Sequence, residues 1–312
     1  MVESCPLDSP SPFSARAALN SQHSTLNFPM STATVIDAQL VKTLREKTNA
    51  GLMECKRALA ETNGDLEAAV DVLRKKGAAS AAKKAGNEAK EGVIAQAILP
   101  GAKVGVLVEI NCQTDFVAKN DGFKAFTDDI ARKIATEPGV DLEADRIAAV
   151  QKVGENIVIR RSDRVEVSGH GAVAAYIHTG GKVGVLVEVG ANKDETTTTE
   201  AFKQLVRDIT LQIAAANPIS VDRSAVPAAT LERERAIYRE QVPPGKPANI
   251  IEKIVDRKID KFYSTVCLVD QAFIKNPDQT ISQLVAAKSK ELGDQLVIRR
   301  FLRYSVGEQI GA

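Results

Sequence analysis

The chain is poor in aromatic residues. Its 312 residues include no Trp, 4 Tyr and 9 Phe, so aromatic side chains make up only 4% of the sequence. Proteins that bind single-stranded nucleic acid without sequence preference stack the bases on exposed rings. The composition therefore argues against a base-stacking surface, and we expect no direct binding of nucleic acid.

Cysteine and histidine are also scarce, and the few that exist are scattered. No CxxC pair and no cysteine–histidine spacing typical of a zinc site occurs, so we expect neither a metal nor a disulfide framework. Phosphate-binding motifs are missing as well, because no GxxxxGK[ST] occurs and no GxGxxG follows a strand. We therefore expect no bound cofactor. The residues concerned are Cys5, Cys55, Cys112, Cys267, His23, His170 and His178.

Long apolar runs and an excess of one charge are absent too. No stretch approaches the roughly 20 apolar residues needed to span a bilayer, so no membrane segment is expected. Lys plus Arg number 41 and Asp plus Glu number 40. A nearly neutral chain is not steered to nucleic acid or to a membrane by its bulk charge. The sequence instead predicts a soluble, cytoplasmic globular protein.

Residues 1–33 differ in composition from the rest of the chain. They are rich in Ser, Pro, Ala and Thr and show no hydrophobic periodicity, which predicts a disordered extension. The acidic residues Glu3 and Asp8 and the single Arg16 argue against a transit peptide, which is rich in Arg and poor in acid. Met30 offers an alternative start of translation.

Residues 34–77 have the pattern of three short helices. Apolar residues recur at helical spacing around Leu44, Leu59 and Leu73. About 45 residues make a marginal core, so we expect this domain to assist a larger body. The expected caps and breaks are Asp37, residues 49–51, Asn63-Gly64, Asp65 and, at the end of the third helix, Gly77.

The stretch that follows, 74–91, holds many Lys and Ala and no large apolar residue. We interpret it as a solvated, partly helical linker, with 78–91 connecting two domains, because runs of charge are usually solvated. A basic patch for nucleic acid is the alternative interpretation.

An internal repeat organises the remainder. "KVGVLVE" occurs at 103–109 and again at 182–188, and each copy forms an alternating β run that follows another one across a Gly-containing turn. "VGENIVIRR" at 153–161 resembles "LGDQLVIRR" at 292–300, and each reads as a helix end, a Gly stop and a third strand. The repeat predicts an α+β protein with two similar units. Each unit has a three-stranded sheet with helices on one face. A hairpin joins the first two strands, so at least these two are antiparallel.

The second copy carries about 60 extra residues before its third strand. The surplus falls within about 222–285 and is helical in pattern, interrupted by "PPGKP" at 243–247, since Pro blocks a helix. It predicts an inserted helical hairpin. The predicted domains are therefore 1–33, 34–77, 78–91, 92–168 and 169–312.

One acid–aromatic pair follows the repeat in the first copy only. Asp115-Phe116 aligns with Asp194-Glu195, so the acid is kept and the ring is not. Thr114 or Asp115 could cap a helix here with Phe116 packed beneath it. A ring that merely filled the core should have an apolar counterpart, however. The Glu in the second copy favours an exposed aromatic side chain that contacts a partner.

Two other functions compete with this interpretation. A cysteine hydrolase would use Cys112 as nucleophile and His178 as base. Cys112 ends an apolar strand, where a thiol usually behaves as a small hydrophobe, so we expect it to be inert. A binding module would use the helical domain 34–77 to hold other proteins or RNA, with only the basic linker in its support.

Two long motifs resemble those of a known family. "LREKTNAGLMECKRAL" at 44–59 and "EINCQTDFVAKND" at 109–121 are similar to the two signatures of bacterial elongation factor Ts, the guanine-nucleotide exchange factor for elongation factor Tu. The resemblance covers roughly 34–310, and two separate motifs in the right order are far more specific than one short match. It implies a ubiquitin-associated-like N-terminal domain and a coiled-coil hairpin.

The resemblance also implies a mechanism. The chain would bind GDP-bound and nucleotide-free elongation factor Tu, one-to-one or two-to-two, and promote GDP release without covalent chemistry. Thr114, Asp115, Phe116 and Val117 would reach the partner's magnesium and phosphate site. There the ring would wedge between helices and the acid would perturb the surroundings of the ion. The implied partner-binding residues are Lys42, Arg45, Leu52, Met53, Val153, Gly154 and His178.

Overall fold

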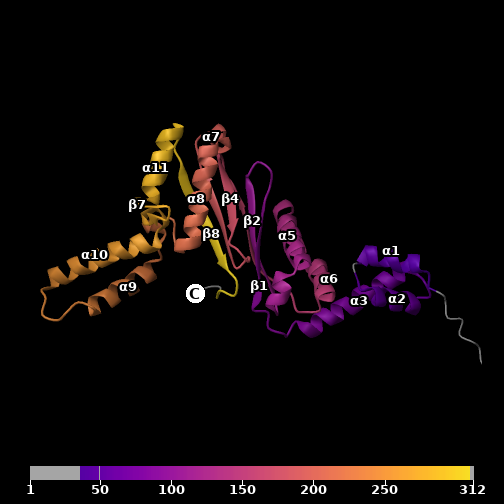
Figure 1. Cartoon of the computed structure of the whole chain (residues 1–312). Coiled ribbons are helices and arrows are strands. Elements are labelled where there is room, and N and C mark those ends of the chain that lie inside the picture. The colour runs from indigo at the N-terminus through magenta and orange to yellow at the C-terminus, as the bar shows by residue number, and fades with distance from the viewer. Residues whose placement is uncertain (1–35, 49, 310–312) are drawn as a thin grey trace, which may run out of the picture. The chain divides into compact units, whose positions relative to one another are not determined.

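The structure, a computed structural model, describes residues 36–48 and 50–309, so the predicted extension 1–33 lies outside the described residues (Figure 1). No helix in this described part is long and apolar enough to cross a membrane. In chain order the first half contains α1 (Ala38–Thr48), α2 (Leu52–Glu61), α3 (Leu66–Lys84), β1 (Glu91–Ile98), β2 (Val104–Cys112), α4 (Asp115–Lys119), α5 (Asp121–Thr136), α6 (Glu143–Val153) and β3 (Val158–Glu166).

The second half repeats this order with an addition. Its elements are β4 (Gly171–Ile177), β5 (Val183–Gly190), α7 (Asp194–Thr198), α8 (Glu200–Ala216), η1 (Arg223–Ala225), α9 (Ala228–Glu240), α10 (Ala248–Val266), η2 (Leu268–Asp270), β6 (Ala272–Phe273), β7 (Asn276–Thr280), α11 (Ile281–Leu292) and β8 (Val297–Ser305).

The three N-terminal helices form as the periodicity predicts. They bury Leu44, Leu59 and Leu73 in one apolar cluster. The predicted cap of α3 is confirmed, because the Asp65 carboxylate accepts hydrogen bonds from the first free backbone N–H groups of that helix. Asp37 does the same for α1, where it accepts from the N–H of Gln39 at 3.0 Å.

The prediction that Gly77 ends the third helix is wrong. Helix α3 continues to Lys84, and Gly77 is buried inside it. A Cβ at this position would lie 2.5 Å from the Gln151 side chain of α6, so glycine here permits close contact between two helices. The Gln151 amide also donates to the Leu73 carbonyl at 3.3 Å. A glycine that serves contact with a distant segment looks like a stop signal in the local sequence.

Two three-stranded antiparallel sheets confirm the repeat. Their strand orders are β1-β2-β3 and β4-β5-β8. The registers match at the repeat spacing, since Gly92 pairs with Asn111 in one hairpin and Gly171 with Gly190 in the other. Even the irregularity recurs, because the pairing shifts after Glu109 in the first sheet and at the equivalent place in the second.

Helices pack on one face of each sheet, as predicted. In the first copy Phe123 and Ile130 of α5 pack against β2, and in the second Phe202 and Ile209 of α8 pack against β5. The remaining faces of the two sheets share a smaller apolar cluster. Its fully or largely buried members are Ile94, Leu107, Val165, Val173, Leu186 and Tyr304.

Hydrogen bonds join the two copies in a symmetric way that the sequence pattern did not reveal. The N–H of Ile94 donates to the carbonyl of Gly181 at 2.7 Å, and the N–H of Val173 donates to that of Ala102 at 2.8 Å. Both donors and both acceptors are equivalent positions of the repeat. The duplicated units therefore contact one another about an approximate twofold relation.

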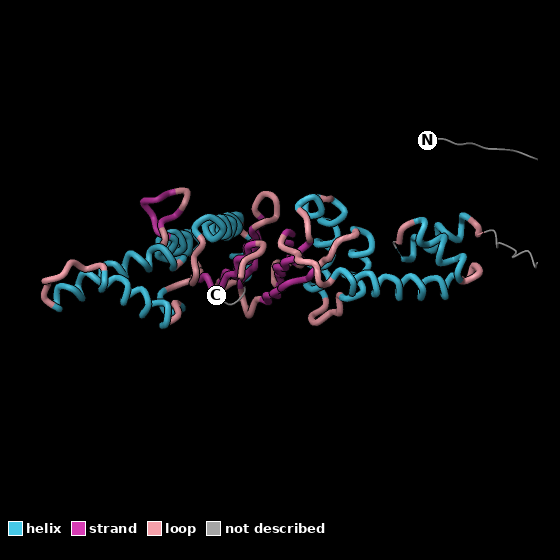
Figure 2. The backbone as a smooth tube through the Cα atoms, turned by 90° about the horizontal axis from the view of Figure 1, so that it is seen from below, coloured by secondary structure: helices cyan, strands magenta, loops and turns pink. Residues whose placement is uncertain are grey.

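The extra residues of the second copy lie between α8 and α11. Helices α9 and α10 run side by side, joined by one loop (Figure 2). They are tied by ion pairs of Arg239 with Glu252 at 2.9 Å and of Arg235 with Asp256 at 3.0 Å. The small β6–β7 hairpin that follows was not predicted, and the predicted insertion 222–285 overlaps the start of α11. The domain boundaries and the ubiquitin-associated-like and coiled-coil assignments stay predictions.

Candidate functional site

The turn after β2 presents Phe116 to solvent. Strand β2 ends at Cys112, and α4 begins at Asp115 with Thr114 as its N-cap, whose hydroxyl accepts from the N–H of Val117 at 3.4 Å. The capping role considered for Thr114 is therefore confirmed. Phe116 is 82% exposed, more than any other large apolar side chain of the described residues. Its alternative role as core is wrong.

A carboxylate that the sequence analysis missed holds this turn. Glu155 accepts hydrogen bonds from the backbone N–H groups of Gln113 and Thr114, both at 3.1 Å, and from the Thr114 hydroxyl at 2.7 Å. The sequence did contain a sign of this role, because an acidic residue directly follows the helix-ending glycine in both copies, Glu155 in the first and Asp294 in the second. The turn is therefore fixed at its base while the ring points away from the core.

Asp115 lies beside the ring and is charged at neutral pH. Its carboxylate pairs with Lys119 at 2.7 Å, one helical turn later, and about half of its side chain is exposed. The hydrogen bond from Lys119 lowers the pKa of Asp115 from its ordinary value. The turn thus displays a negative charge and an apolar ring next to each other.

A groove of about 680 Å³ opens beside the turn. Phe116, Val117 and Val153 contribute apolar surface to it, together with side chains of α5 such as Phe126. Gly154 follows directly as the left-handed C-cap of α6, with φ of 84°. The structure therefore brings Thr114–Val117 and the predicted contact positions Val153 and Gly154 to one place.

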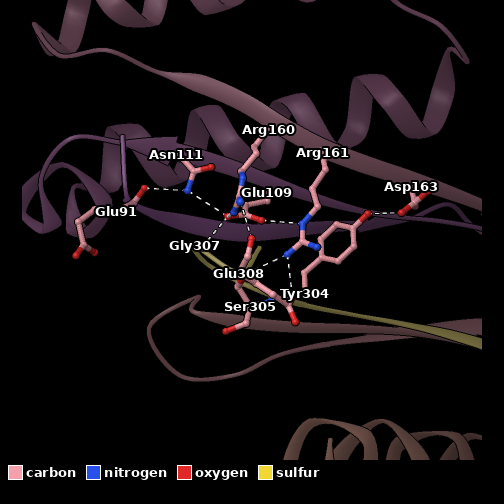
Figure 3. A network of polar contacts seen from close by, with 10 residues as sticks. All are labelled: Glu91, Glu109, Asn111, Arg160, Arg161, Asp163, Tyr304, Ser305, Gly307 and Glu308. Atoms are coloured by element: carbon pink, nitrogen blue, oxygen red, sulfur yellow. Dashed lines mark hydrogen bonds and ion pairs between the residues drawn. The ribbon is translucent and has the colours of Figure 1, made fainter. Parts of the chain in front are cut away.

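A buried ionic network anchors the strand that leads to the site (Figure 3). Glu109 of β2 is fully buried and accepts from Arg160 at 2.9 Å, from Arg161 at 2.8 Å and from the N–H of Gly307 at 2.9 Å. Burial raises the pKa of Glu109, but the hydrogen bonds of Gly307, Arg160, Asn111 and Arg161 outweigh it, so the pKa lies below its ordinary value. Glu109 therefore stays charged and holds β2 in place.

Comparison with known proteins identifies the family. The family model described as "Elongation factor TS" matches residues 113–308, which is more than half of the chain. Elongation factor Ts of Clostridium novyi is 42% identical over 291 residues, covering 88% of this chain and 94% of that protein. Elongation factor Ts of Clostridium botulinum strain Alaska E43 is 44% identical over 292 residues with the same coverage, and that of Trichlorobacter lovleyi is 42% identical over 290 residues, covering 88% and 93%.

The chain belongs to the elongation factor Ts family. The resemblance inferred from the two motifs is thus confirmed. Members of this family are translation elongation factors that act by nucleotide exchange and not by covalent catalysis.

Four other positions expected of an elongation factor Ts protein lie in the N-terminal helices. Lys42 and Arg45 are exposed on α1. Leu52 and Met53 begin α2 and are 55% and 60% exposed. Leu52 shares helical spacing with Cys55 and Leu59, which are fully buried, but as the first residue of its helix it stays exposed. The two neighbouring apolar side chains make a second small patch.

His178, the last expected contact position, lies on the turn between β4 and β5. It is exposed, and its Nδ1 lies 3.0 Å from the Tyr176 hydroxyl. The described contacts do not connect His178 with the groove. The structure thus groups the predicted residues into a turn-and-groove site, a patch on α1 and α2, and the separate His178.

The cysteine in an elongation factor Ts signature motif is structural in this chain. Cys112 is fully buried, and its Sγ lies 3.2 Å from the Thr114 carbonyl. Burial, and then the nearby charge of Glu155, raise the pKa of the Cys112 thiol to about 11. A neutral, enclosed thiol cannot act as a nucleophile. Among the described residues no group of His, Cys, Asp and Glu could hold a metal ion either.

Proposed function

We propose that the chain promotes GDP release from elongation factor Tu by presenting Phe116 and Asp115 to the partner's magnesium and phosphate site. The observation that carries the proposal is the exposure of Phe116 on a turn whose backbone is fixed by Glu155. An exposed ring on a flexible loop would collapse onto apolar surface. A ring on a fixed turn stays available for a partner.

The ring supplies binding energy that depends on the partner's conformation. Fully burying an apolar side chain of this size contributes about 1.5–3 kcal/mol relative to leaving it exposed. Aromatic side chains are also enriched among the residues that dominate interfaces. If the ring fits only the nucleotide-free form, this energy favours that form and weakens nucleotide binding by the same factor, because coupling between two ligands is reciprocal.

The carboxylate supplies the electrostatic part. Mg²⁺ is held by oxygen ligands and screens the negative phosphates of a bound nucleotide from one another. A negative side chain placed beside this site competes for the ion and repels the phosphates. Asp115 has this charge at neutral pH, and Lys119 is its partner in the free protein.

The remaining predicted positions would hold the partner. We assign Lys42, Arg45, Leu52 and Met53 to one contact surface, because the four are exposed on adjacent helices. Val153 and Gly154 would extend the contact at the turn, and His178 would form a separate one. Translation elongation takes place in the bacterial cytoplasm, so we expect the chain to act there.

The decisive experiment follows fluorescent GDP leaving elongation factor Tu with and without the chain. We expect clear acceleration by the parent protein and much less by Phe116→Ala or Asp115→Ala. Glu195→Ala is the matched control, since Glu195 is exposed at the position equivalent to Phe116 in the second copy. Absence of acceleration by the parent would refute the function. Equal acceleration by the parent and both turn variants would refute only the assigned site. Light scattering of the complex decides between one-to-one and two-to-two assembly.

A further inference from the structure

We propose that Glu155 is a positioning residue for nucleotide exchange, whose carboxylate sets the orientation of Phe116 through the backbone of the turn. The proposal rests on the function assigned above to Phe116. It extends that function to a residue on the segment between α6 and β3, 41 positions away from Thr114 in the sequence.

A single carboxylate controls the start of α4. Glu155 accepts from two consecutive backbone N–H groups, those of Gln113 and Thr114, and from the Thr114 hydroxyl. That hydroxyl in turn accepts from the N–H of Val117. Hydrogen bonds therefore connect Glu155 to the residues on both sides of the Asp115-Phe116 pair. Helix α4 has only five residues, and so short a helix has no stability of its own. These contacts fix the start of the helix, while Ala118 and Val117 pack its other side against the core.

The base of the turn is held from a second side. The Gln113 side-chain oxygen accepts from the N–H of Asn156 at 2.8 Å, so Gln113 and the 155–156 segment bind one another in both directions. The Asn156 amide also donates to the Asn87 carbonyl at 2.8 Å. Glu155 therefore lies on a segment whose next residue is itself held by hydrogen bonds to two other segments.

The second copy contains a similar clamp without the ring, although its hydroxyl donor, Thr196, stands at the position of Val117 and not of Thr114. Asp294 accepts from the N–H groups of Asn192 and Lys193 at 3.1 and 3.2 Å and from the Thr196 hydroxyl at 2.6 Å. Its turn presents Glu195 where the first copy presents Phe116. The clamp itself is thus a feature of the duplicated fold, and only the first copy uses it to hold an aromatic side chain. Asp294 also demonstrates that an aspartate at this position reaches both backbone amides.

The first test needs no partner. Because the chain contains no Trp, Phe116→Trp introduces a single Trp at the site, which can be excited selectively over the 4 Tyr of the chain. We expect Glu155→Ala to lower the fluorescence anisotropy of this Trp, and Asp294→Ala to leave it unchanged. Unchanged anisotropy in Glu155→Ala would overturn the proposal, even if Phe116 proved essential for exchange.

The second test measures GDP release at saturating concentrations of each variant. We expect Glu155→Ala to lower the maximal rate of GDP release by about tenfold. Misplacing a functional group by about 1 Å can lower a rate by even more than this. Glu155→Asp should recover most of that loss, and Asp294→Ala should match the parent. In the Asp115→Ala, Phe116→Ala background, Glu155→Ala should cause no further loss, since it acts through the two side chains that the turn presents. Equal losses in both backgrounds would overturn the proposal.

Stability is measured on the same proteins by urea unfolding. If Glu155→Ala fails to fold, Glu155→Met replaces it, because Met keeps the length of the side chain but has no acceptor oxygen for the two backbone N–H groups. A folded Glu155→Met protein with the parent's anisotropy and maximal rate would refute the positioning role.

Discussion

Glu109 and Glu188 occupy the same register position in the two sheets, and each accepts hydrogen bonds from two consecutive arginines. Arg160 and Arg161 bind Glu109, while Arg299 and Arg300 bind Glu188 at 3.0 and 2.8 Å. Both carboxylates are buried. In each copy, two arginines of the third strand thus neutralise the buried glutamate of the second strand.

The same arginines reach across to the other copy. Arg161 donates to the Ser305 carbonyl at 3.1 Å, at the end of the second copy's third strand (Figure 3). Arg300 donates to the Glu166 carbonyl at 3.1 Å, at the end of the first copy's third strand. The exchange is reciprocal, so breaking either network weakens the contact between copies as well as one sheet.

Removing Glu109 should be costly. Glu109→Ala leaves two arginines and the Gly307 N–H without their acceptor, and breaking a buried ion pair on one side typically costs about 3–5 kcal/mol. We expect the free energy of unfolding to fall by about 3 kcal/mol, measured by urea unfolding. Glu308→Ala is the control, because that carboxylate is well exposed and its pair with Arg161 contributes little. Similar losses in the two variants would contradict the role assigned to the buried network.

Stability should also fall in acid through the same group. The pKa of Glu109 lies below its ordinary value of 4.5, so its contribution is complete above the unfolded pKa and is lost as the pH falls through the folded one. We expect the parent to lose more stability than Glu109→Gln between about pH 5 and pH 3. Urea unfolding at a series of pH values measures the difference. Parallel pH profiles would show that Glu109 is not protonated in this range.

The contact between the sheets should tolerate no added methyl group at Gly184. A Cβ there would lie 2.5 Å from Ile94 Cγ2 and 3.0 Å from Leu107 Cδ1, both in the shared apolar cluster. We expect Gly184→Ala to destabilise the protein by about 1–3 kcal/mol. Gly86→Ala, where the Cβ would meet nothing within 4 Å, should change stability by less than about 0.5 kcal/mol. Thermal unfolding of the two variants compares them directly.

The apolar patch at the start of α2 should matter for binding and not for folding. Leu52 and Met53 are mostly exposed, so replacing both by Ala removes little buried surface. We expect unchanged unfolding and an affinity for elongation factor Tu weakened about tenfold or more, measured by calorimetry. Leu59→Ala, at a fully buried position of the same helix, should instead destabilise by about 2–5 kcal/mol. Unchanged affinity in the double variant would remove this patch from the proposed interface.

Cys112 should be dispensable for exchange. Its buried thiol, with a pKa raised to about 11, is not a nucleophile at neutral pH. We expect Cys112→Ala to retain the parent's rate of GDP release while losing about 1 kcal/mol of stability to a small cavity. Loss of all activity in a folded Cys112→Ala protein would revive the hydrolase alternative.

The repeated architecture and the exceptional residue within it could be predicted from local patterns in the sequence. Strand alternation, the repeat spacing and the Gly stop at Gly154 are local signals, because period and turn chemistry act over a few neighbouring residues. The comparison of Phe116 with Glu195 needed only the repeat. Two long motifs then determined the family.

The residues that hold the site and the contacts between the copies could not be predicted, because they depend on how distant segments pack. Glu155 binds the turn at Thr114 from 41 positions away, Gly77 makes room for Gln151, and Arg161 and Arg300 bind carbonyls of the opposite copy. Such contacts produce no periodic pattern in a single sequence. Each residue involved has the local sequence context of a cap, a helix end or a surface charge. Their energies depend on burial and distance, and both arise only when distant segments pack together.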